Sequence, residues 1–168
     1  MLRYLKLRVG FMLLKILIVL MVSMLPVIEL RGALLIAASI GLPEFLSLIV
    51  AMVGNLIPMP FVFKFGREVL EKGAKSKHKR LRDFCKWCIK KGNKGSDKLE
   101  AKTKNSIYVA LLLFVGIPLP GTGAWTGTLA ATFLNLNYKK TMIAVGCGTL
   151  LAGLIMLAIS FGLFDLLF

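Results

Sequence analysis

The chain has 168 residues, of which 57% are hydrophobic, with a mean hydropathy of +0.79 and a formal net charge of +14. A soluble domain of this length needs more polar surface, so the composition predicts an all-α integral membrane protein of one domain. Three cysteines make no disulfide framework, and the sequence contains no nucleophile–base pair, metal cluster or phosphate-binding loop. We therefore expect neither an enzyme nor a cofactor.

The N-terminal segment is basic and then apolar. Arg3, Lys6 and Arg8 precede an apolar stretch over residues 9–25 that contains Lys15. No small-residue cleavage site follows, so we expect the segment to be retained rather than removed as a signal peptide. We expect it to enter the membrane as the first arm of a re-entrant hairpin. The positive-inside rule favours two other arrangements, a spanning arm or an interfacial one.

A break follows this arm. Pro26 precedes a short apolar stretch, residues 27–40, that contains Gly32 and is too short to span a membrane. A broken helix at membrane depth leaves backbone groups unpaired, which is tolerated only where protein or a water-filled cavity receives them. The break is therefore a candidate site.

Glu29 and Arg31 stand beside this break and are the only ionisable residues between Lys15 and Glu44. A charge at the bilayer centre costs at least about 2.5 kcal/mol, so such residues commonly mark a substrate or ion path. We predict that Arg31 holds an anionic group and that Glu29 carries a proton. In the alternative interpretation, the turn lies in the head-group region and both charges are solvated.

Residues 44–63 form an apolar stretch of the length of one spanning helix. A basic insertion follows, in which residues 64–104 hold 15 of the 22 Lys and Arg residues and five of the eight acids. The positive-inside rule places this insertion on the cytoplasmic side of the cell membrane. We expect it to meet anionic lipid head groups and not nucleic acid, because the lipid lies beside it.

Within the insertion, apolar residues recur at helical spacing, which predicts an amphipathic helix. This apolar stripe consists of Leu81, Phe84, Cys85, Cys88 and Ile89. The predicted lipid surface consists of Arg80, Arg82, Lys86, Trp87 and Lys90. Packing of the stripe against the rest of the protein is the alternative. Cys85 and Cys88 have CxxC spacing but no second ligand pair, which argues against a zinc or redox site.

The second apolar half, residues 105–168, is broken at residues 118–127. We predict that free N–H groups at a helix starting near Ala124 bind a negative group. The residues assigned to this substrate site are Gly121, Thr122, Gly123 and Thr126, and those assigned to the break itself are Pro118, Pro120 and Gly127. A glycine-rich packing surface is the alternative interpretation.

The two halves match at an offset of about 94 residues, which pairs Pro26 with Pro120 and Gly54 with Gly148. Each half reads as an apolar arm, a break, a short helix, a polar corner and a long helix. A re-entrant hairpin followed by one crossing would turn the second copy upside down, giving the inverted repeat of many secondary transporters. We therefore expect a first repeat over 1–65, the insertion over 66–104 and a second repeat over 105–168, with the two breaks meeting at mid-membrane.

The residues that carry a family resemblance are Glu29 to Gly32, Asn55 to Phe61 and Pro118 to Gly127. Over nearly its whole length the chain resembles the small multidrug export protein family, which in turn is distantly similar to the DedA membrane proteins. That resemblance implies a transporter built on paired re-entrant hairpins. DedA proteins are implicated in moving lipid carriers such as undecaprenyl phosphate, and their membrane-embedded acids and arginines are functional, a pattern that Glu29 and Arg31 match.

Three functions follow as expectations. The first is a small secondary transporter, coupled to protons through Glu29, that moves an amphipathic anion such as a polyprenyl phosphate. The second is an exporter of hydrophobic cationic drugs, and the third is a non-transporting scaffold whose insertion binds lipid or a protein partner. Because so few helices enclose little space, we also expect a homo-oligomer, most simply a dimer.

Overall fold

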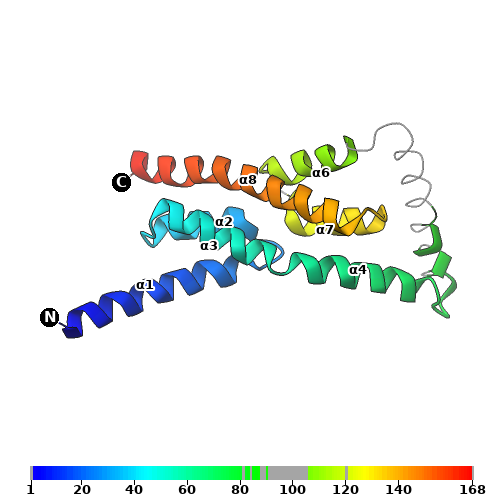
Figure 1. Ribbon diagram of the computed structural model, residues 1–168, viewed down its shortest axis with the longest axis horizontal. Helices are drawn as coiled ribbons and strands as arrows, with labels where there is room; N and C mark the ends of the chain where they lie inside the picture. The colour runs from blue at the N-terminus through cyan, green and yellow to red at the C-terminus, as the bar shows by residue number, and fades with distance from the viewer. Residues whose placement is uncertain are drawn as a thin grey trace. The chain divides into compact units, whose positions relative to one another are not determined.

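The computed structural model describes residues 2–80, 82–83, 85–87, 90, 106–119 and 121–167. Every secondary-structure element in these ranges is an α-helix, which confirms the all-helical prediction for them (Figure 1). Two stretches are long and apolar enough to cross a membrane, Glu44–Gly73 and Tyr138–Gly162. In the 18-residue apolar window of each stretch, 44% and 39% of the residues are buried in the protein, so both stretches expose apolar side chains as lipid-facing helices do.

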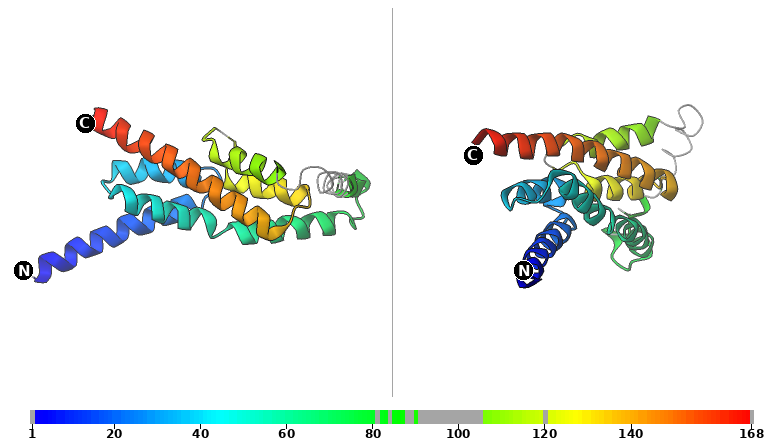
Figure 2. Two further views of the ribbon diagram at one scale, coloured as in Figure 1. Left: turned by 45° about the horizontal axis from the view of Figure 1, so that its top comes forward. Right: turned by 60° about the vertical axis from the view of Figure 1, so that its left-hand side comes forward.

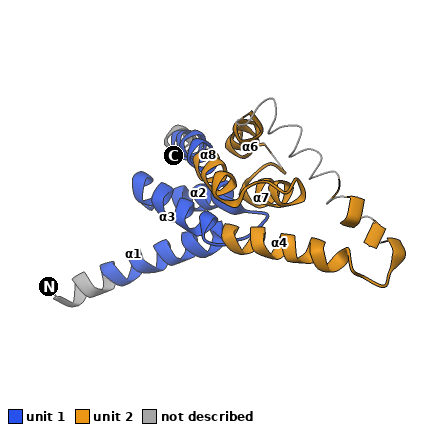
Figure 3. Cartoon of the chain, turned by 45° about the vertical axis from the view of Figure 1, so that its right-hand side comes forward, with its two compact units in different colours: residues 1–58, 149–168 blue, residues 59–148 orange. Residues whose placement is uncertain are grey.

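The chain forms two compact units (Figure 3). Unit 1 consists of Met1–Pro58 and Thr149–Phe168. It contains α1 (Leu2–Ser23), α2 (Glu29–Ser39), α3 (Glu44–Leu56) and the C-terminal part of α8 (Tyr138–Leu167).

Within unit 1, α2 folds back beside α1, and both helices pack on α3 (Figure 2). The core of this unit is apolar and comes from all three helices and α8; it includes Val19, Leu30, Leu34, Ala51 and Met156. Burial of these side chains supplies the main packing energy of the unit.

Unit 2 consists of Met59–Gly148. It contains α4 (Met59–Gly73), α6 (Ser106–Gly116), α7 (Ala124–Phe133) and the N-terminal part of α8. Helix α7 packs on both α4 and α6, and the buried hydroxyl of Thr128 on α7 lies 3.3 Å from the sulfur of Met59 on α4.

Aromatic side chains fix the start of α8 within unit 2. The rings of Phe63 and Tyr138 meet edge to face with centroids 5.4 Å apart. On the other side, the backbone N–H of Asn137 donates to the Tyr108 hydroxyl at 3.1 Å, and the Lys140 ammonium lies 5.5 Å from the Tyr108 ring centroid. Edge-to-face rings and a cation over a ring are both favourable geometries.

At the first polar corner, α2 ends with a residue in the left-handed backbone conformation. Gly41 has a φ of +65°, and its N–H donates to Ala38 O at 3.0 Å. The N–H of Leu42 reaches back to Ala37 O, also at 3.0 Å, and the Leu42 side chain is buried. This pair of bonds satisfies carbonyls that the helix end would leave unpaired.

The second corner, after α7, has the same hydrogen bonds 94 residues later. Asn135 has a φ of +51°, its N–H donates to Thr132 O, and the N–H of the buried Leu136 donates to Ala131 O, both at 3.0 Å. Asparagine is the residue that most readily replaces glycine in this conformation.

Gly41→Ala is expected to lower the free energy of unfolding by about 1 kcal/mol, because a Cβ is strained at positive φ. Asn135→Gly, which removes a Cβ from the equivalent position, should leave stability unchanged or slightly raised. Thermal unfolding of the purified protein in detergent measures both. Gly10→Ala is the control, because open space surrounds a Cβ at Gly10; equal effects of Gly41→Ala and Gly10→Ala would contradict the assignment.

Two glycines allow close helix packing, of α3 on α1 in unit 1 and of α8 on α6 in unit 2. A Cβ at Gly54 on α3 would lie 2.5 Å from the carbonyl oxygen of Leu20 on α1. A Cβ at Gly148 on α8 would lie 2.7 Å from the carbonyl oxygen of Leu112 on α6. The two glycines that the sequence comparison paired thus have the same role, one in each unit.

Several helix bounds differ from the expected ones. Helix α1 begins at Leu2, ahead of the apolar stretch over residues 9–25, so the basic N-terminal residues are helical. Helix α4 continues to Gly73, well beyond the apolar stretch that was expected to end near residue 63, because its charged residues are good helix formers and pair at i, i+4 spacing.

Candidate functional site

The first break lies between α1 and α2 and is stabilised by short-range hydrogen bonds between backbone groups. The N–H of Leu25 donates to Val22 O at 3.1 Å, and the N–H of Glu29 donates to Leu25 O at 2.9 Å. Pro26 lies between them at the exposed tip of the turn, where its missing N–H leaves no bond unmade. The helix therefore breaks where the sequence predicted.

Glu29 is the most unusual residue of this turn. Its φ is +51°, a left-handed conformation that costs a non-glycine residue about 1–2 kcal/mol. It is also 7% exposed, so the carboxylate is buried at the first turn of α2, where the helix dipole favours a negative charge. Strained, buried and ionisable residues concentrate at functional sites.

Arg31 lies near enough to Glu29 for the two charges to attract each other. On a regular helix, side chains two residues apart do not face each other. The left-handed backbone at Glu29 makes the start of α2 irregular, so the spacing rule of a regular helix does not apply there. Arg31 is half-buried, with the fully buried Leu30 between the two charged residues in sequence. The predicted site residues Glu29 and Arg31 thus lie together in unit 1.

The glycine of this turn has a local packing role. A Cβ at Gly32 would run into the Ile28 side chain, one turn back along the chain. The N–H of Gly32 donates to Ile28 O at 3.0 Å, which places the two residues against each other. Gly32 therefore lets Ile28 cover the start of α2.

The second break, between α6 and α7, is stabilised by hydrogen bonds from Thr122. The Thr122 hydroxyl lies 2.9 Å from both Ile117 O and Leu119 O, and these two carbonyls share its single proton. The N–H of Thr122 also donates to Leu119 O at 3.2 Å. Because its proton is already used by the loop, Thr122 can offer a substrate only its acceptor lone pairs.

Thr122→Val is expected to destabilise the protein by about 1 kcal/mol, the usual net value of a lost hydrogen bond. Thr122→Ser keeps the hydroxyl and should restore most of that stability. Thermal unfolding in detergent compares the two variants. If valine is tolerated as well as serine, the hydroxyl does not stabilise the break.

The other predicted residues of the second break take different roles. Gly121 has a φ of +82° and is exposed, which requires glycine-like backbone freedom. Gly123 is buried and precedes α7 without any side-chain cap, and the Thr126 hydroxyl donates to its carbonyl at 3.3 Å. A Cβ at Gly127 would lie 2.6 Å from the Val115 side chain, so Gly127 serves helix packing. Pro118 is half-buried in this loop, and Pro120 lies outside the described residues.

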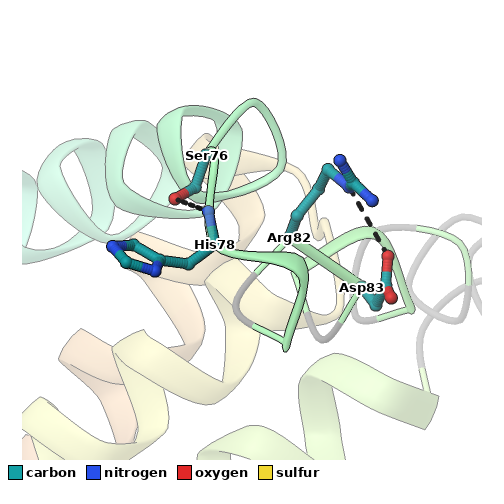
Figure 4. Close-up of polar contacts among 4 residues, drawn as sticks. All are labelled: Ser76, His78, Arg82 and Asp83. Carbon is teal, nitrogen blue, oxygen red and sulfur yellow. Dashed lines mark hydrogen bonds and ion pairs between the residues drawn. The ribbon is translucent and has the colours of Figure 1, made fainter.

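The predicted lipid surface is only partly described. Arg80, Lys86, Trp87 and Lys90 are exposed, while Arg82 is half-exposed with its Nε 3.6 Å from Asp83 Oδ1 (Figure 4). The same figure shows the N–H of His78 donating to the Ser76 hydroxyl, at 3.3 Å, at the start of this segment.

The apolar stripe of the insertion can be followed at one position. Cys85 is 3% exposed, and a Cβ at Gly73, the last residue of α4, would lie 2.5 Å from its sulfur. At Cys85 the stripe thus packs on the protein, as the alternative interpretation proposed. Its other members, Leu81, Phe84, Cys88 and Ile89, lie outside the described residues.

Two buried polar groups were not assigned to the site from sequence. Asn55 Oδ1 and Thr149 Oγ1 are buried and make no hydrogen bond within the described part of the chain. Both belong to unit 1 and they are 94 residues apart. Their position within otherwise apolar helices is a signal that was available in the sequence.

A comparison with models of known protein families gives a match. A family model described as "Putative small multi-drug export protein" matches residues 29–155, about three quarters of the chain. The matched region begins at Glu29 and includes Arg31, both candidate spans up to residue 155, and the second break. The comparisons with curated proteins and with solved structures give no match.

Proposed function

Since the chain belongs to the small multi-drug export protein family, we propose that it is a small secondary transporter of an amphipathic substrate, with Glu29 and Arg31 as its substrate and proton site. Family membership and the two apolar spans support a location in a membrane. The multi-pass topology, the cell membrane as its location and the cytoplasmic side of residues 66–104 rest on the charge bias of the sequence.

The observation that carries the proposal is the buried Glu29 carboxylate beside Arg31. An isolated charge in a dry site is costly, and each of these residues lowers that cost for the other. A group that disturbs this pair changes the charge balance of the site. A coupled transporter needs such a site, in which protonation or substrate binding changes the charge balance.

In this proposal, the Glu29–Arg31 pair couples the binding of a proton to the binding of an anion. When Glu29 is ionised, it neutralises Arg31 and an anion gains little by entering. When Glu29 takes up a proton, its attraction for Arg31 is lost and the guanidinium is available to a phosphate or carboxylate, which it binds through paired N–H donors. Proton and anion thus bind together and leave together.

The sign of the charges favours an anion as cargo. A hydrophobic cation would be attracted by Glu29 but repelled by Arg31, whereas an anionic head group meets Arg31 beside a protonated acid. An anionic lipid carrier such as a polyprenyl phosphate fits this chemistry, and it is the class that the resemblance to DedA proteins would imply. Export of cationic drugs, which the family description suggests, is the alternative cargo.

The matching helix bounds support a repeated architecture. The stretch from the start of α3 to the end of α4 covers residues 44–73, and α8 covers 138–167, so both bounds differ by 94. The corner hydrogen bonds of Leu42 and Leu136 match at the same offset. One candidate span in each copy supports the inversion of the second copy relative to the first.

The proposal is tested by reconstitution in liposomes. We expect the wild-type protein to accelerate movement of a fluorescent polyprenyl phosphate analogue, and a pH gradient to drive its accumulation. A lipophilic cation such as tetraphenylphosphonium is the parallel probe. If the cation moves and the phosphate does not, the cargo assignment is wrong; if neither moves at any pH gradient, the transport proposal fails.

The scaffold function rests on the exposed basic residues of the insertion, with Trp87 beside them. Deletion of residues 74–100 separates the two functions. We expect the truncated protein to retain liposome transport within about threefold of the wild type while losing most binding to anionic vesicles, at roughly 1 kcal/mol per basic residue removed. Loss of all cellular phenotype with transport intact would instead favour the scaffold.

A further inference from the structure

Unit 2 contains a groove that the transport proposal does not use. It has a volume of about 500 Å³ and is lined along one face of α4 and by Tyr138 at the start of α8. Its lining residues on α4 are Pro60, Phe61, Phe63, Lys64, Arg67, Glu68 and Glu71. Phe63 forms the buried floor beside Tyr138, and Phe61 is 72% exposed at the apolar end.

The groove begins where the hydrocarbon region of a bilayer would end. No charged residue occurs between Glu44 and Lys64. These 19 uncharged residues are about the number that a membrane-spanning segment needs. Lys64 is therefore expected at head-group depth, with Phe61 beside the part of the acyl chains nearest the head groups.

Chemical groups follow one another along the groove in a fixed order. The apolar residues Pro60 and Phe61 come first, the cations Lys64 and Arg67 next, and the carboxylates of Glu68 and Glu71 last. The cations precede the acids by four residues on average, about 6 Å along the helix. A phospholipid with an amine head group has the same order of acyl chain, phosphate and ammonium.

The charged side chains of the groove are held only by weak pairs. Arg67 Nε lies 3.5 Å from a Glu71 oxygen, and Lys72 Nζ lies 2.6 Å from a Glu68 oxygen, with all four side chains at least half-exposed. Exposed pairs of this kind contribute little to stability. A bound phosphate and ammonium can therefore replace them at small cost.

The acid end of the groove also distinguishes between amine head groups. A primary ammonium donates three hydrogen bonds and suits carboxylates, whereas a quaternary ammonium donates none and is held by aromatic faces. Among the lining residues of α4, Glu68 and Glu71 come last, and the aromatic residues Phe61 and Phe63 come before the cations. The groove therefore suits a primary amine.

From this order we propose that the α4 groove binds a zwitterionic aminophospholipid, phosphatidylethanolamine in chemical class. Lys64 and Arg67 contact its phosphate, Glu68 and Glu71 receive its ammonium, and Phe61 lies against its acyl chain. This site differs from the predicted anionic-lipid surface around Arg80 and Trp87, because its lining charges balance.

Native mass spectrometry of the full-length protein in detergent tests the proposal. The probes are phosphatidylethanolamine, phosphatidylglycerol and phosphatidylcholine with identical acyl chains, supplied together in equal amounts. We expect the wild type to retain phosphatidylethanolamine over each competitor by about tenfold, the value of one charged hydrogen bond. Equal retention of phosphatidylcholine, or preference for phosphatidylglycerol, would overturn the proposal without any variant.

Variants then assign the two ends of the groove. Glu68→Gln with Glu71→Gln should abolish the preference for phosphatidylethanolamine over phosphatidylglycerol while binding of phosphatidylglycerol persists. Lys64→Gln with Arg67→Gln should reduce retention of all three lipids. Glu44→Gln and Lys139→Gln, exposed charges outside both the groove and the basic insertion, are the matched controls. An unchanged preference in the double glutamate variant, in protein that elutes as the wild type does, would refute the assignment.

Discussion

Arg31→Gln is expected to reduce proteoliposome transport by at least about tenfold, because a hydrogen bond to a charged group contributes roughly 1.5–3 kcal/mol. Arg31→Lys keeps the charge but loses the planar fork of donors, so we expect a partial loss and a weaker preference for phosphate. The variants should remain folded, since Arg31 is half-buried and its neighbours Leu30 and Ala33 supply the packing.

Glu29→Gln should separate binding from coupling. A glutamine preserves the shape of the side chain and leaves Arg31 permanently available, so exchange of substrate across the membrane continues while accumulation driven by a pH gradient is lost. Measuring exchange and gradient-driven uptake on the same liposomes distinguishes these results.

Glu44→Gln and Lys15→Gln provide matched controls for the site. Glu44 is an exposed acid at the start of α3, and Lys15 is the next cation along the chain from Arg31 in the N-terminal direction. Both should transport as the wild type does. If Glu29→Gln and Arg31→Gln also transport as the wild type does, the two charges are solvated in the head-group region and the site assignment is wrong.

Gly54→Ala and Gly148→Ala are expected to destabilise the protein by about 1–3 kcal/mol each, the usual cost of overpacking a close contact. In both cases the added methyl group meets a backbone carbonyl, at 2.5 Å for Leu20 and 2.7 Å for Leu112. A backbone atom within a helix cannot move aside as a flexible side chain can, so the helices must separate.

Gly146→Ala is the control for this pair. It lies in α8 close to Gly148, and a Cβ there meets no atom within 4 Å. Alanine in an exposed helix interior is more stable than glycine by about 0.5–1 kcal/mol, so this variant should raise the unfolding temperature. If all three alanine variants change stability alike, the close approach of the helices is not what requires glycine.

Features that depend on local backbone chemistry could be predicted from the sequence. Pro26 marks the first break because proline cannot continue a helix, and Gly41 marks a corner because glycine tolerates positive φ. The pairing of Gly54 with Gly148 was also accessible, since a small residue recurs at a fixed offset within an apolar helix.

Features that depend on a particular backbone angle or hydrogen bond could not be predicted. Nothing in the residue type of Glu29 indicates its φ of +51°. The Thr122 hydroxyl was predicted to face a substrate, and its use by two carbonyls of its own loop is visible only in three dimensions. Grouping of α4 with α7 is likewise set by long-range packing.

Unit 1 combines segments from both ends of the sequence, which has a consequence for biogenesis. Its core residues Leu30 and Leu48 lie against Gly153, which is translated about 100 residues after them. The first hairpin therefore leaves the ribosome before its covering helix exists, and during that interval it must be shielded by the insertion machinery or by lipid. Ribosome stalling between residues 60 and 148 should trap the hairpin in a protease-sensitive state that resolves once α8 is complete.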